Sequence, residues 1–226
     1  MSYPHIAGIA NGVQTSDSTT WTASYPGDVR NGDLVLLVVS SDGTGRASAS
    51  GFTEALYSSQ GATVACTILR DSADGTEAGQ SISLTIDAAE QGAWRCITVR
   101  GLNIARLLDV SLVGGLDTHP TSGGFSFQSQ DILSLVFAAA DASATLVSIP
   151  ASYTDTTPTG GDVSGGANGS SLFVAYRQVT TGSENPGQWT ISSSVNWVAG
   201  TYIIHTLPGN PPPIVVGSMT ALQGRL

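Results

Sequence analysis

The apolar residues of this chain recur in short runs, and clusters of turn-forming residues separate one run from the next. Apolar residues almost never recur at helical spacing, whereas turn signals such as Pro26–Asp28, Asn31–Asp33 and Glu184–Gly187 follow at short intervals. The run Leu34–Val39 does not alternate with polar residues, which indicates a strand buried on both faces. The pattern predicts an all-β fold, an antiparallel β-sandwich that is jelly-roll-like, with an extended C-terminal arm.

The runs give the expected strands. In the first half we expect them near Thr19–Ser24, Asp33–Ser41, Phe52–Tyr57, Thr63–Arg70, Ser81–Ile86, Trp94–Arg100 and Leu107–Val113. In the second half we expect them near Ile132–Ala139, Tyr153–Thr156, Ser171–Gln178, Gln188–Ser193 and Thr201–Leu207. One sandwich domain then covers residues 1–207, with residues 1–18 as an N-terminal extension, because β-sandwiches of this length commonly form one unit.

The two halves share a weak internal similarity. The segment Asp33–Leu36 resembles Asp131–Ser134, and each is followed by an aromatic residue and a threonine. Arg70 ends an expected strand before Gly-x-Glu, and so does Arg177. The spacing between matched positions drifts from 98 to 107 residues, so this is not a strict tandem repeat. Two halves with the same order of strands would build the two facing sheets of one sandwich, and we expect that rather than two separate domains.

The composition changes at Pro208. The segment Pro208–Pro213 cannot join the interior of a sheet, because proline lacks the amide donor and fixes φ, so it predicts a stiff spacer. Residues 208–226 are therefore expected to form an interaction arm. The apolar residues predicted to pack against a partner chain are Ile214, Val215, Val216 and Leu222.

The charge of the chain argues against two classes of partner. The formal net charge is −9, there is no lysine, and the eight arginines stand singly. Nucleic-acid binding needs a clustered basic face, and an anionic membrane surface would repel this chain. No basic region followed by an apolar stretch opens the sequence, so we expect synthesis in the cytoplasm without a signal peptide.

The two cysteines, Cys66 and Cys96, each lie in an expected strand. A disulfide between these strands is one alternative. Two reduced, buried thiols are the other, and we predict them because a core of this size needs no covalent bridge and the chain is made in a reducing compartment.

None of the usual catalytic motifs occurs in the chain. It has no nucleophile elbow, no zinc-binding helix motif and no lysine for a phosphate loop, and its three histidines are far apart. The acidic segment Asp71–Glu77 invites a calcium site, but Ala73 and Gly75 stand where oxygen ligands are needed, which favours a hairpin turn. The stretch Gly160–Gly166 is expected to be a loop. A distant pair of carboxylates for sugar hydrolysis stays open, although nothing nominates one. We predict no catalytic residue, no cofactor and no metal site.

The tryptophans and two arginines have alternative interpretations. The tryptophans could form a face on which sugars stack. We expect them instead to pack in the core or at a sheet edge, because each ring buries a large apolar area. The four are Trp21, Trp94, Trp189 and Trp197. Arg70 and Arg177 are expected to bind exposed carbonyl groups or a nearby acid at strand ends.

Several of these motifs together resemble β-sandwich proteins of tailed bacteriophage particles. In the first half they are Gly32–Leu36, Gly51–Thr53, Arg70, Trp94 and Arg100–Gly101. In the second half they are Asp131–Leu133, Tyr153–Thr154, Ala175–Arg177, Gly182–Glu184 and Trp189. The resemblance spans roughly Trp21 to Leu207, and its motifs are structural. It departs from the family pattern at Phe52, where Trp is expected, and at Ser152, where Gly is expected.

The resemblance implies a structural protein of the bacteriophage virion. The expected role is a capsid decoration, cement or head-fibre subunit that binds the particle through protein–protein contacts with major capsid or tail proteins. It implies a homo-oligomer, a trimer by analogy, and carries over no catalytic residue. The alternative function is a tail-located module that binds a receptor or a host glycan.

Overall fold

A computed structural model of the chain describes residues 3–101, 107–126, 131–142, 144–156, 162–165, 168–180 and 182–205. The regular structure in these ranges consists of strands. None of the described residues belongs to a helix that could cross a membrane. The predicted all-β class is confirmed.

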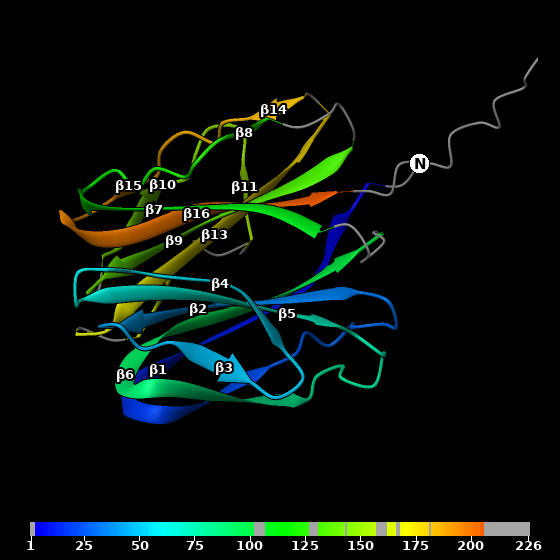
Figure 1. The fold of residues 1–226 in the computed structure, drawn as a ribbon, viewed down its shortest axis with the longest axis horizontal. Helices are drawn as coiled ribbons and strands as arrows, with labels where there is room; N and C mark the ends of the chain where they lie inside the picture. The colour runs from blue at the N-terminus through cyan, green and yellow to red at the C-terminus, as the bar shows by residue number, and fades with distance from the viewer. Residues whose placement is uncertain are drawn as a thin grey trace, which may run out of the picture.

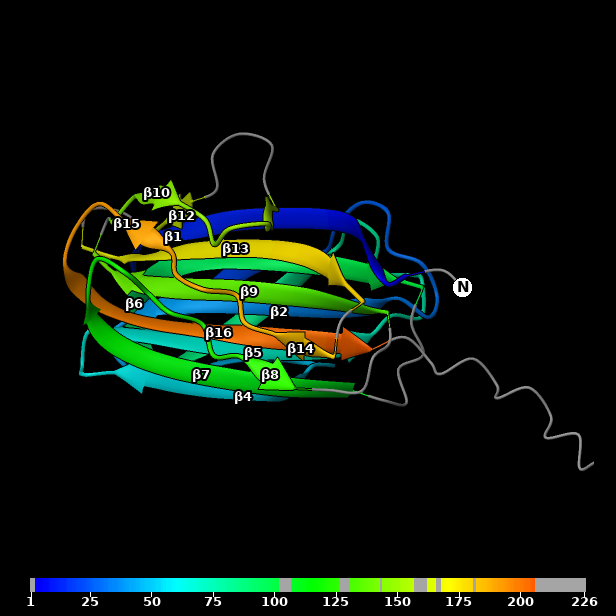
Figure 2. The same ribbon diagram turned by 90° about the horizontal axis from the view of Figure 1, so that it is seen from above.

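Two six-stranded antiparallel sheets lie face to face (Figure 1 and Figure 2). The first sheet has the order β1-β6-β2-β5-β4, and β3 pairs with β6. Its strands are β1 (His5–Ser24), β2 (Leu34–Asp42), β3 (Ala47–Ala49), β4 (Thr53–Gln60), β5 (Val64–Ser72) and β6 (Ser81–Arg100).

The second sheet has the order β11-β13-β9-β16-β7, and β12 pairs with β13. Its strands are β7 (Leu107–Asp117), β9 (Ile132–Asp141), β11 (Thr154–Asp155), β12 (Asp162–Ser164), β13 (Ser170–Val179) and β16 (Val195–His205). Two small pairs lie outside it, formed by β8 (Phe125–Ser126) with β14 (Ser183–Glu184) and by β10 (Leu146–Ser148) with β15 (Thr190–Ile191).

The two sheets repeat one order of strands. Strand β1 corresponds to β7, β6 to β16, β2 to β9, β5 to β13, and β4 to β11 with β12. Each sheet therefore comes from one half of the chain, residues 3–101 for the first half and 107–205 for the second. The expectation that two similar halves build the facing sheets of one sandwich is confirmed.

Matching tryptophans fix the correspondence between the halves. Trp94 of β6 packs on Gly12 of β1, where a Cβ atom would overlap the indole ring. Trp197 of β16 packs in the same way on Gly115 of β7. In both halves the absence of a side chain on the edge strand makes room for a ring from the neighbouring strand.

The main core lies between the sheets. Side chains of the central strands interdigitate there, including Leu36, Ile68 and Ile97 from the first sheet and Phe137 and Val174 from the second. Burial of this apolar area is the dominant favourable contribution to folding.

A second layer of core lies on the outer face of each sheet. In the first half, β1 and β6 run beyond the sheet and fold over it with β3, so that Trp21 and Leu84 pack in one cluster with Leu37 of β2. In the second half the β10–β15 pair and its flanking loops place Trp189 over Ala138. Strand β2 is thus buried on both faces, as its unbroken apolar run predicted.

Three expected boundaries are wrong. Strand β1 starts at His5, so most of the expected N-terminal extension, residues 1–18, is an edge strand. The segments Ser81–Ile86 and Trp94–Arg100 are one strand, β6, because the residues between them continue the pairing with β1 through an irregular register. The expected loop Gly160–Gly166 contains the short strand β12, which gains backbone hydrogen bonds by pairing with β13.

Candidate functional site

The edge strands β1 and β7 present the most distinctive exposed apolar positions. Val13 of β1 follows Gly12, and Leu116 of β7 follows Gly115, the two glycines that the tryptophan rings cover. The side chains of Val13 and Leu116 are 45% and 66% exposed. Counterpart positions of the two halves are therefore both apolar and both open to solvent. Scattered apolar residues are ordinary on a surface, but recurrence at matched edge positions is not required by the core.

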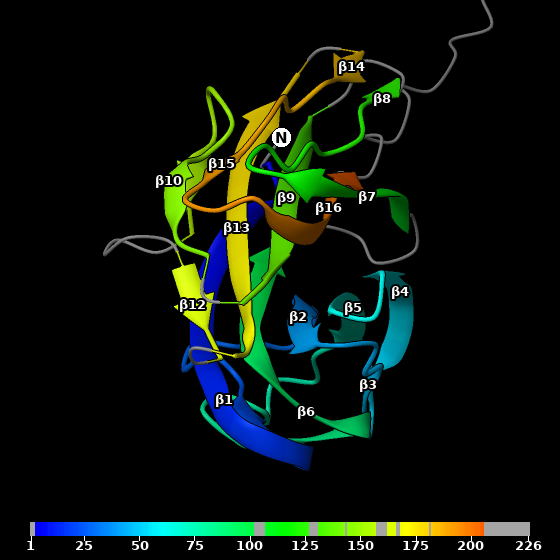
Figure 3. The same cartoon turned by 90° about the vertical axis from the view of Figure 1, so that its left-hand side faces the viewer.

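The two edges lie on opposite sides of the sandwich. Seen end on, β1 lies beside β12 at one side, and β7 lies beside β4 at the other (Figure 3). Each is the last strand in its sheet order, so one row of its backbone amide and carbonyl groups is not used by the sheet. Strand β1 has 20 residues and a single acidic one, Asp17.

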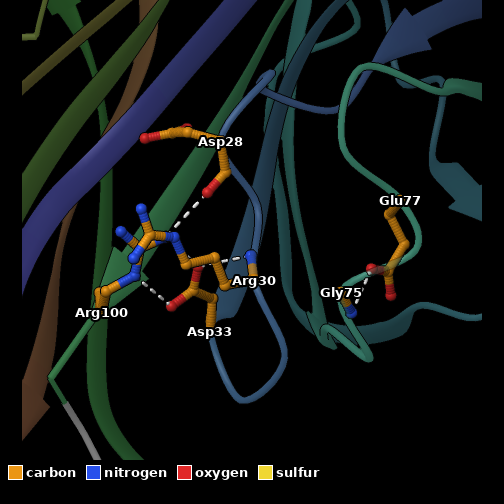
Figure 4. A network of polar contacts seen from close by, with 6 residues as sticks. All are labelled: Asp28, Arg30, Asp33, Gly75, Glu77 and Arg100. Atoms are coloured by element: carbon orange, nitrogen blue, oxygen red, sulfur yellow. Dashed lines mark hydrogen bonds and ion pairs between the residues drawn. The ribbon is translucent and has the colours of Figure 1, made fainter.

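A polar network closes one end of the first sheet (Figure 4). The guanidinium of Arg100 donates to both carboxylate oxygens of Asp33, at 2.9 and 2.7 Å, and to the carbonyl oxygen of Asp28 at 2.8 Å. The backbone N–H of Arg30 donates to Asp33 as well, at 2.9 Å. Asp33 is almost fully buried, so the network fixes the turn before β2 against the end of β6. The motif Gly32–Asp33 marked this turn, but only the fold pairs it with Arg100.

Arg177 and Glu184 form a comparable ion pair in the second half. Arg177 donates to both carboxylate oxygens of Glu184, at 2.7 to 2.9 Å, and the Glu184 side chain is fully buried. The guanidinium also lies over the ring of Tyr153, 5.1 Å from its centroid. The expectation that Arg177 binds a nearby acid is confirmed.

Arg70 does not occupy the equivalent place. It approaches the hydroxyl of Tyr202 in the core between the sheets, where its positive charge opposes the rise in the pKa of Tyr202 that burial causes. Arg177 instead stands on the outer side, over Tyr153. Side chains alternate between the faces of a strand, so an odd shift in register separates the two arginines. The sequence comparison matched Arg70 with Arg177, but the two side chains lie on opposite faces of their sheets.

Arg95 forms hydrogen bonds between the two sheets that sequence analysis missed. Its side chain is fully buried and reaches from β6 across the sandwich, where it donates to the hydroxyl of Thr156 at 2.5 Å and to the carbonyl oxygen of Val174 at 3.4 Å. A basic residue inside an apolar strand was the available signal, but only the packing of the sheets shows its direction.

The tryptophans and cysteines belong to the core. The four tryptophan side chains are between 0% and 6% exposed, so a sugar-stacking face made of them is excluded and core packing is confirmed. Cys66 and Cys96 are both free and buried, as predicted. They belong to different core clusters, on opposite faces of the first sheet, and burial raises the pKa of Cys66 to about 12.

The acidic segment Asp71–Glu77 folds as a turn that binds its own backbone. The Glu77 carboxylate accepts the N–H group of Asp74 at 2.8 Å. It also accepts the N–H group of Gly75 at 2.8 Å (Figure 4). Hydrogen bonds from Thr76 lower the pKa of Asp74. No group of three or more metal-ligating side chains stands together in the described part of the chain.

Acidic residues influence one another's pKa at the end of the sandwich where β2 and β9 finish. Burial raises the pKa of Asp42, and the charges of Asp141 and Asp17 raise it further. Burial, followed by the charges of Asp42 and Asp17, likewise raises the pKa of Glu90. Neighbouring negative charges therefore act on both Asp42 and Glu90, and none of the arginine ion pairs within the described ranges includes these two acids.

The predicted interface residues of the arm, Ile214, Val215, Val216 and Leu222, lie outside the described ranges. The arm therefore stays a prediction from the sequence. Comparison with family models, curated proteins and solved structures found no match for this chain.

Proposed function

We propose that the protein is a structural subunit of a tailed bacteriophage particle, a capsid decoration, cement or head-fibre protein that acts through protein–protein contacts. The sequence motifs that resemble such proteins support the assignment to a bacteriophage particle. One structural observation supports the proposal that the protein acts through contacts with other protein chains. That observation is the pair of edge strands β1 and β7 with exposed apolar residues at matched positions, Val13 and Leu116.

Edge strands favour association with other protein chains. An unpaired strand offers backbone donors and acceptors to a further strand, and soluble monomers commonly block such edges with charges or proline. Strand β1 carries one acidic residue in 20 and no proline, although the whole chain has a net charge of −9. Charge repulsion between copies is therefore weak along this strand.

We commit to a second copy of the chain as the occupant of these edges. Because the two halves repeat one strand order, each copy presents two similar edges on opposite sides, and edge-to-edge contacts would join copies into an oligomer on the particle. The arm beyond residue 207 is proposed to strengthen the attachment through Ile214, Val215, Val216 and Leu222.

Analytical ultracentrifugation of the full chain tests the edges. Val13→Lys and Leu116→Lys each place a charge on an edge and should shift the protein from oligomer to monomer in the micromolar range. Val147→Lys is the matched control, since Val147 is 63% exposed on β10, which is neither of the two edge strands, and should leave the oligomer unchanged. A wild-type protein that stays monomeric throughout this range would contradict self-association.

Gentle disassembly of particles tests the location. The protein should remain with the head fraction when heads and tails are separated and each is probed by immunoblot. Recovery with tails would favour the alternative, a tail-located receptor- or glycan-binding module. Absence from purified particles would overturn the virion proposal.

A further inference from the structure

A pocket opens on the outer side of the first sheet, between β3 and the start of β4. Its volume is about 200 Å³. Its lining residues come from β3, β4, β5, β6 and the turns that join them, and they are Arg46, Ala47, Ser48, Ala49, Phe52, Glu54, Leu69 and Asp87. None of them takes part in the edges proposed for assembly.

The floor of the pocket is apolar. Leu69 and Ala47 are each 1% exposed and belong to the outer core of the first half. Phe52 forms a half-buried wall, and its ring is supported from behind by Tyr25 at a centroid distance of 5.9 Å. A ligand in the pocket would therefore meet a rigid apolar surface.

The rim is polar and held in place. The Arg46 guanidinium donates two hydrogen bonds of 2.5 Å to Glu54 and lies 5.2 Å from the ring centroid of Tyr57. The backbone N–H of Arg46 donates to the Asp87 carboxylate at 2.7 Å. Each charged group of the rim thus has a hydrogen-bond partner within the protein before any ligand arrives, which limits the side-chain freedom lost on binding.

The second half uses the same backbone arrangement without these side chains. Thr145 and Ser192 take the places of Arg46 and Asp87, and they make the equivalent contacts, N–H of Thr145 to the Ser192 hydroxyl and N–H of Ser192 to the Thr145 carbonyl, both at 2.9 Å. In the first half the N–H of Asp87 donates to the Arg46 carbonyl at 3.2 Å. The fold therefore does not require charged residues at these positions.

The floor also differs between the halves. Tyr153 replaces Phe52 after the same turn, since the N–H of each donates to the carbonyl three residues earlier, at 3.2 Å. Phe173 replaces Leu69 at the same register position, opposite the central strand. Tyr153 and Phe173 are both buried in the outer core of the second half. Larger side chains can thus fill this place, whereas the first half keeps it open and charged.

We propose that this pocket binds one neutral pyranose ring of a glycan. Carboxylate oxygens of Glu54 and Asp87 accept hydrogen bonds from sugar hydroxyls, and Arg46 donates to a ring or hydroxyl oxygen. The C–H face of the sugar covers the apolar floor beside Phe52. Two carboxylates disfavour an anionic ligand, and the guanidinium inside the rim disfavours a cationic one.

Amide chemical-shift titration of the full chain tests the proposal. The probes are the methyl pyranosides of glucose, galactose, mannose and N-acetylglucosamine, each added to roughly 10 mM, which is tenfold above a Kd of about 1 mM. At least one sugar should give saturable shifts confined to the segment Arg46–Glu54 and to Asp87. Glu54→Gln and Asp87→Asn should each weaken its binding by about tenfold, because a hydrogen bond to a charged group is lost.

Two further variants complete the experiment. Asp17→Asn removes one acidic charge on β1, outside the pocket, and should bind as the wild type does. Ala49→Leu fills the pocket and should abolish binding while the melting temperature stays within a few degrees. The proposal is overturned if no probe shifts these amides, if shifts arise elsewhere, or if the pocket variants bind normally. These outcomes are separate from those of the assembly test, which depends on Val13 and Leu116.

Discussion

The first half and the second half of the chain reach the same sheet order with different side chains. In the first half an uninterrupted β6 crosses from the sheet to the outer layer, whereas the second half divides the corresponding path into β15 and β16. The buried ion pair is Arg100–Asp33 in one half and Arg177–Glu184 in the other. The tryptophan–glycine contact recurs unchanged, with Trp94 on Gly12 and Trp197 on Gly115.

This difference separates what the architecture needs from what it tolerates. Both halves need apolar central strands and a large ring over the edge strand, because these bury most of the apolar area. Polar contacts occur in both halves, but their residues and positions are exchanged. A surface feature found in one half alone, such as the pocket beside Arg46, is therefore free to serve binding.

The largest expected effect comes from the shared tryptophans. Trp94→Ala and Trp197→Ala should each lower the free energy of unfolding by about 3–5 kcal/mol, since each leaves a cavity over a glycine. Urea denaturation followed by circular dichroism measures it. Val147→Ala, at an exposed position, should stay within about 0.5 kcal/mol. A loss below about 1 kcal/mol for one tryptophan alone would mean that the halves are not equivalent there.

The buried ion pairs should come next. Glu184→Gln and Asp33→Asn keep the shape of the side chain but remove its charge, and each should cost about 2–3 kcal/mol. Glu54→Gln, in the exposed pair with Arg46, is the comparison and should cost less than about 1 kcal/mol. Similar losses for all three in thermal denaturation would show that burial does not govern these contacts.

Substitutions in the turns before β4 and β11 should have smaller effects on the free energy of unfolding, with opposite signs in the two halves. Gly51 has φ +86° and Ser152 has φ +68°, so both stand in the left-handed region. Gly51→Ser should destabilise the protein by about 1 kcal/mol, because a side chain strains the backbone at this positive φ. No atom lies within 4 Å of the Cβ position, so a steric clash adds nothing to this loss. Ser152→Gly should stabilise by about 0.5 kcal/mol, the entropy of glycine offsetting part of the relieved strain. Equal signs in chemical denaturation would refute the equivalence of the turns.

The smallest effect concerns the acids at the end of β2 and β9. The pKa of Asp42 is raised, so folding favours its protonated form, and that contribution to stability is lost as the pH rises through the folded pKa. Asp42→Asn should therefore raise the melting temperature slightly at neutral pH, and the gain should vanish below the ordinary pKa of about 3.9.

Asp74 supplies the control of opposite sign for this pH dependence. Its pKa is lowered, so its ionised form contributes stability above the ordinary pKa, and that contribution is lost as the pH falls through the folded pKa. Asp74→Asn should lower the melting temperature at neutral pH and have no effect in acid. A gain for Asp74→Asn, or none for Asp42→Asn, would contradict the assigned directions in a series of thermal melts.

Local patterns predicted much of the fold. Apolar runs located the central strands, and Leu34–Val39 revealed burial on both faces because neither side of that strand carries polar residues. Glycine and proline clusters located the turns. The similarity of the halves predicted two facing sheets, although its alignment matched Arg70 with Arg177, which the strand register places on opposite faces of their sheets.

The polar sites were beyond local patterns. Asp33 and Arg100 are 67 positions apart in the sequence, and the hydrogen bond from Arg95 to Thr156 spans 61. The pocket beside Arg46 likewise joins residues of four strands with the turns between them. Such contacts depend on which strands become neighbours, and many pairings satisfy the same alternation of apolar and polar residues.

The sequence by itself determined the class of fold, the turns and the burial of tryptophans and cysteines, since these follow from backbone preferences and apolar area that each segment carries with it. The tertiary structure alone decided that Val13 and Leu116 stand on free edges and that Arg46, Glu54 and Asp87 surround an opening. The physical reason is that strand order and register decide which side chains are exposed and which distant residues come into contact. Neither property is contained in a single segment of the chain.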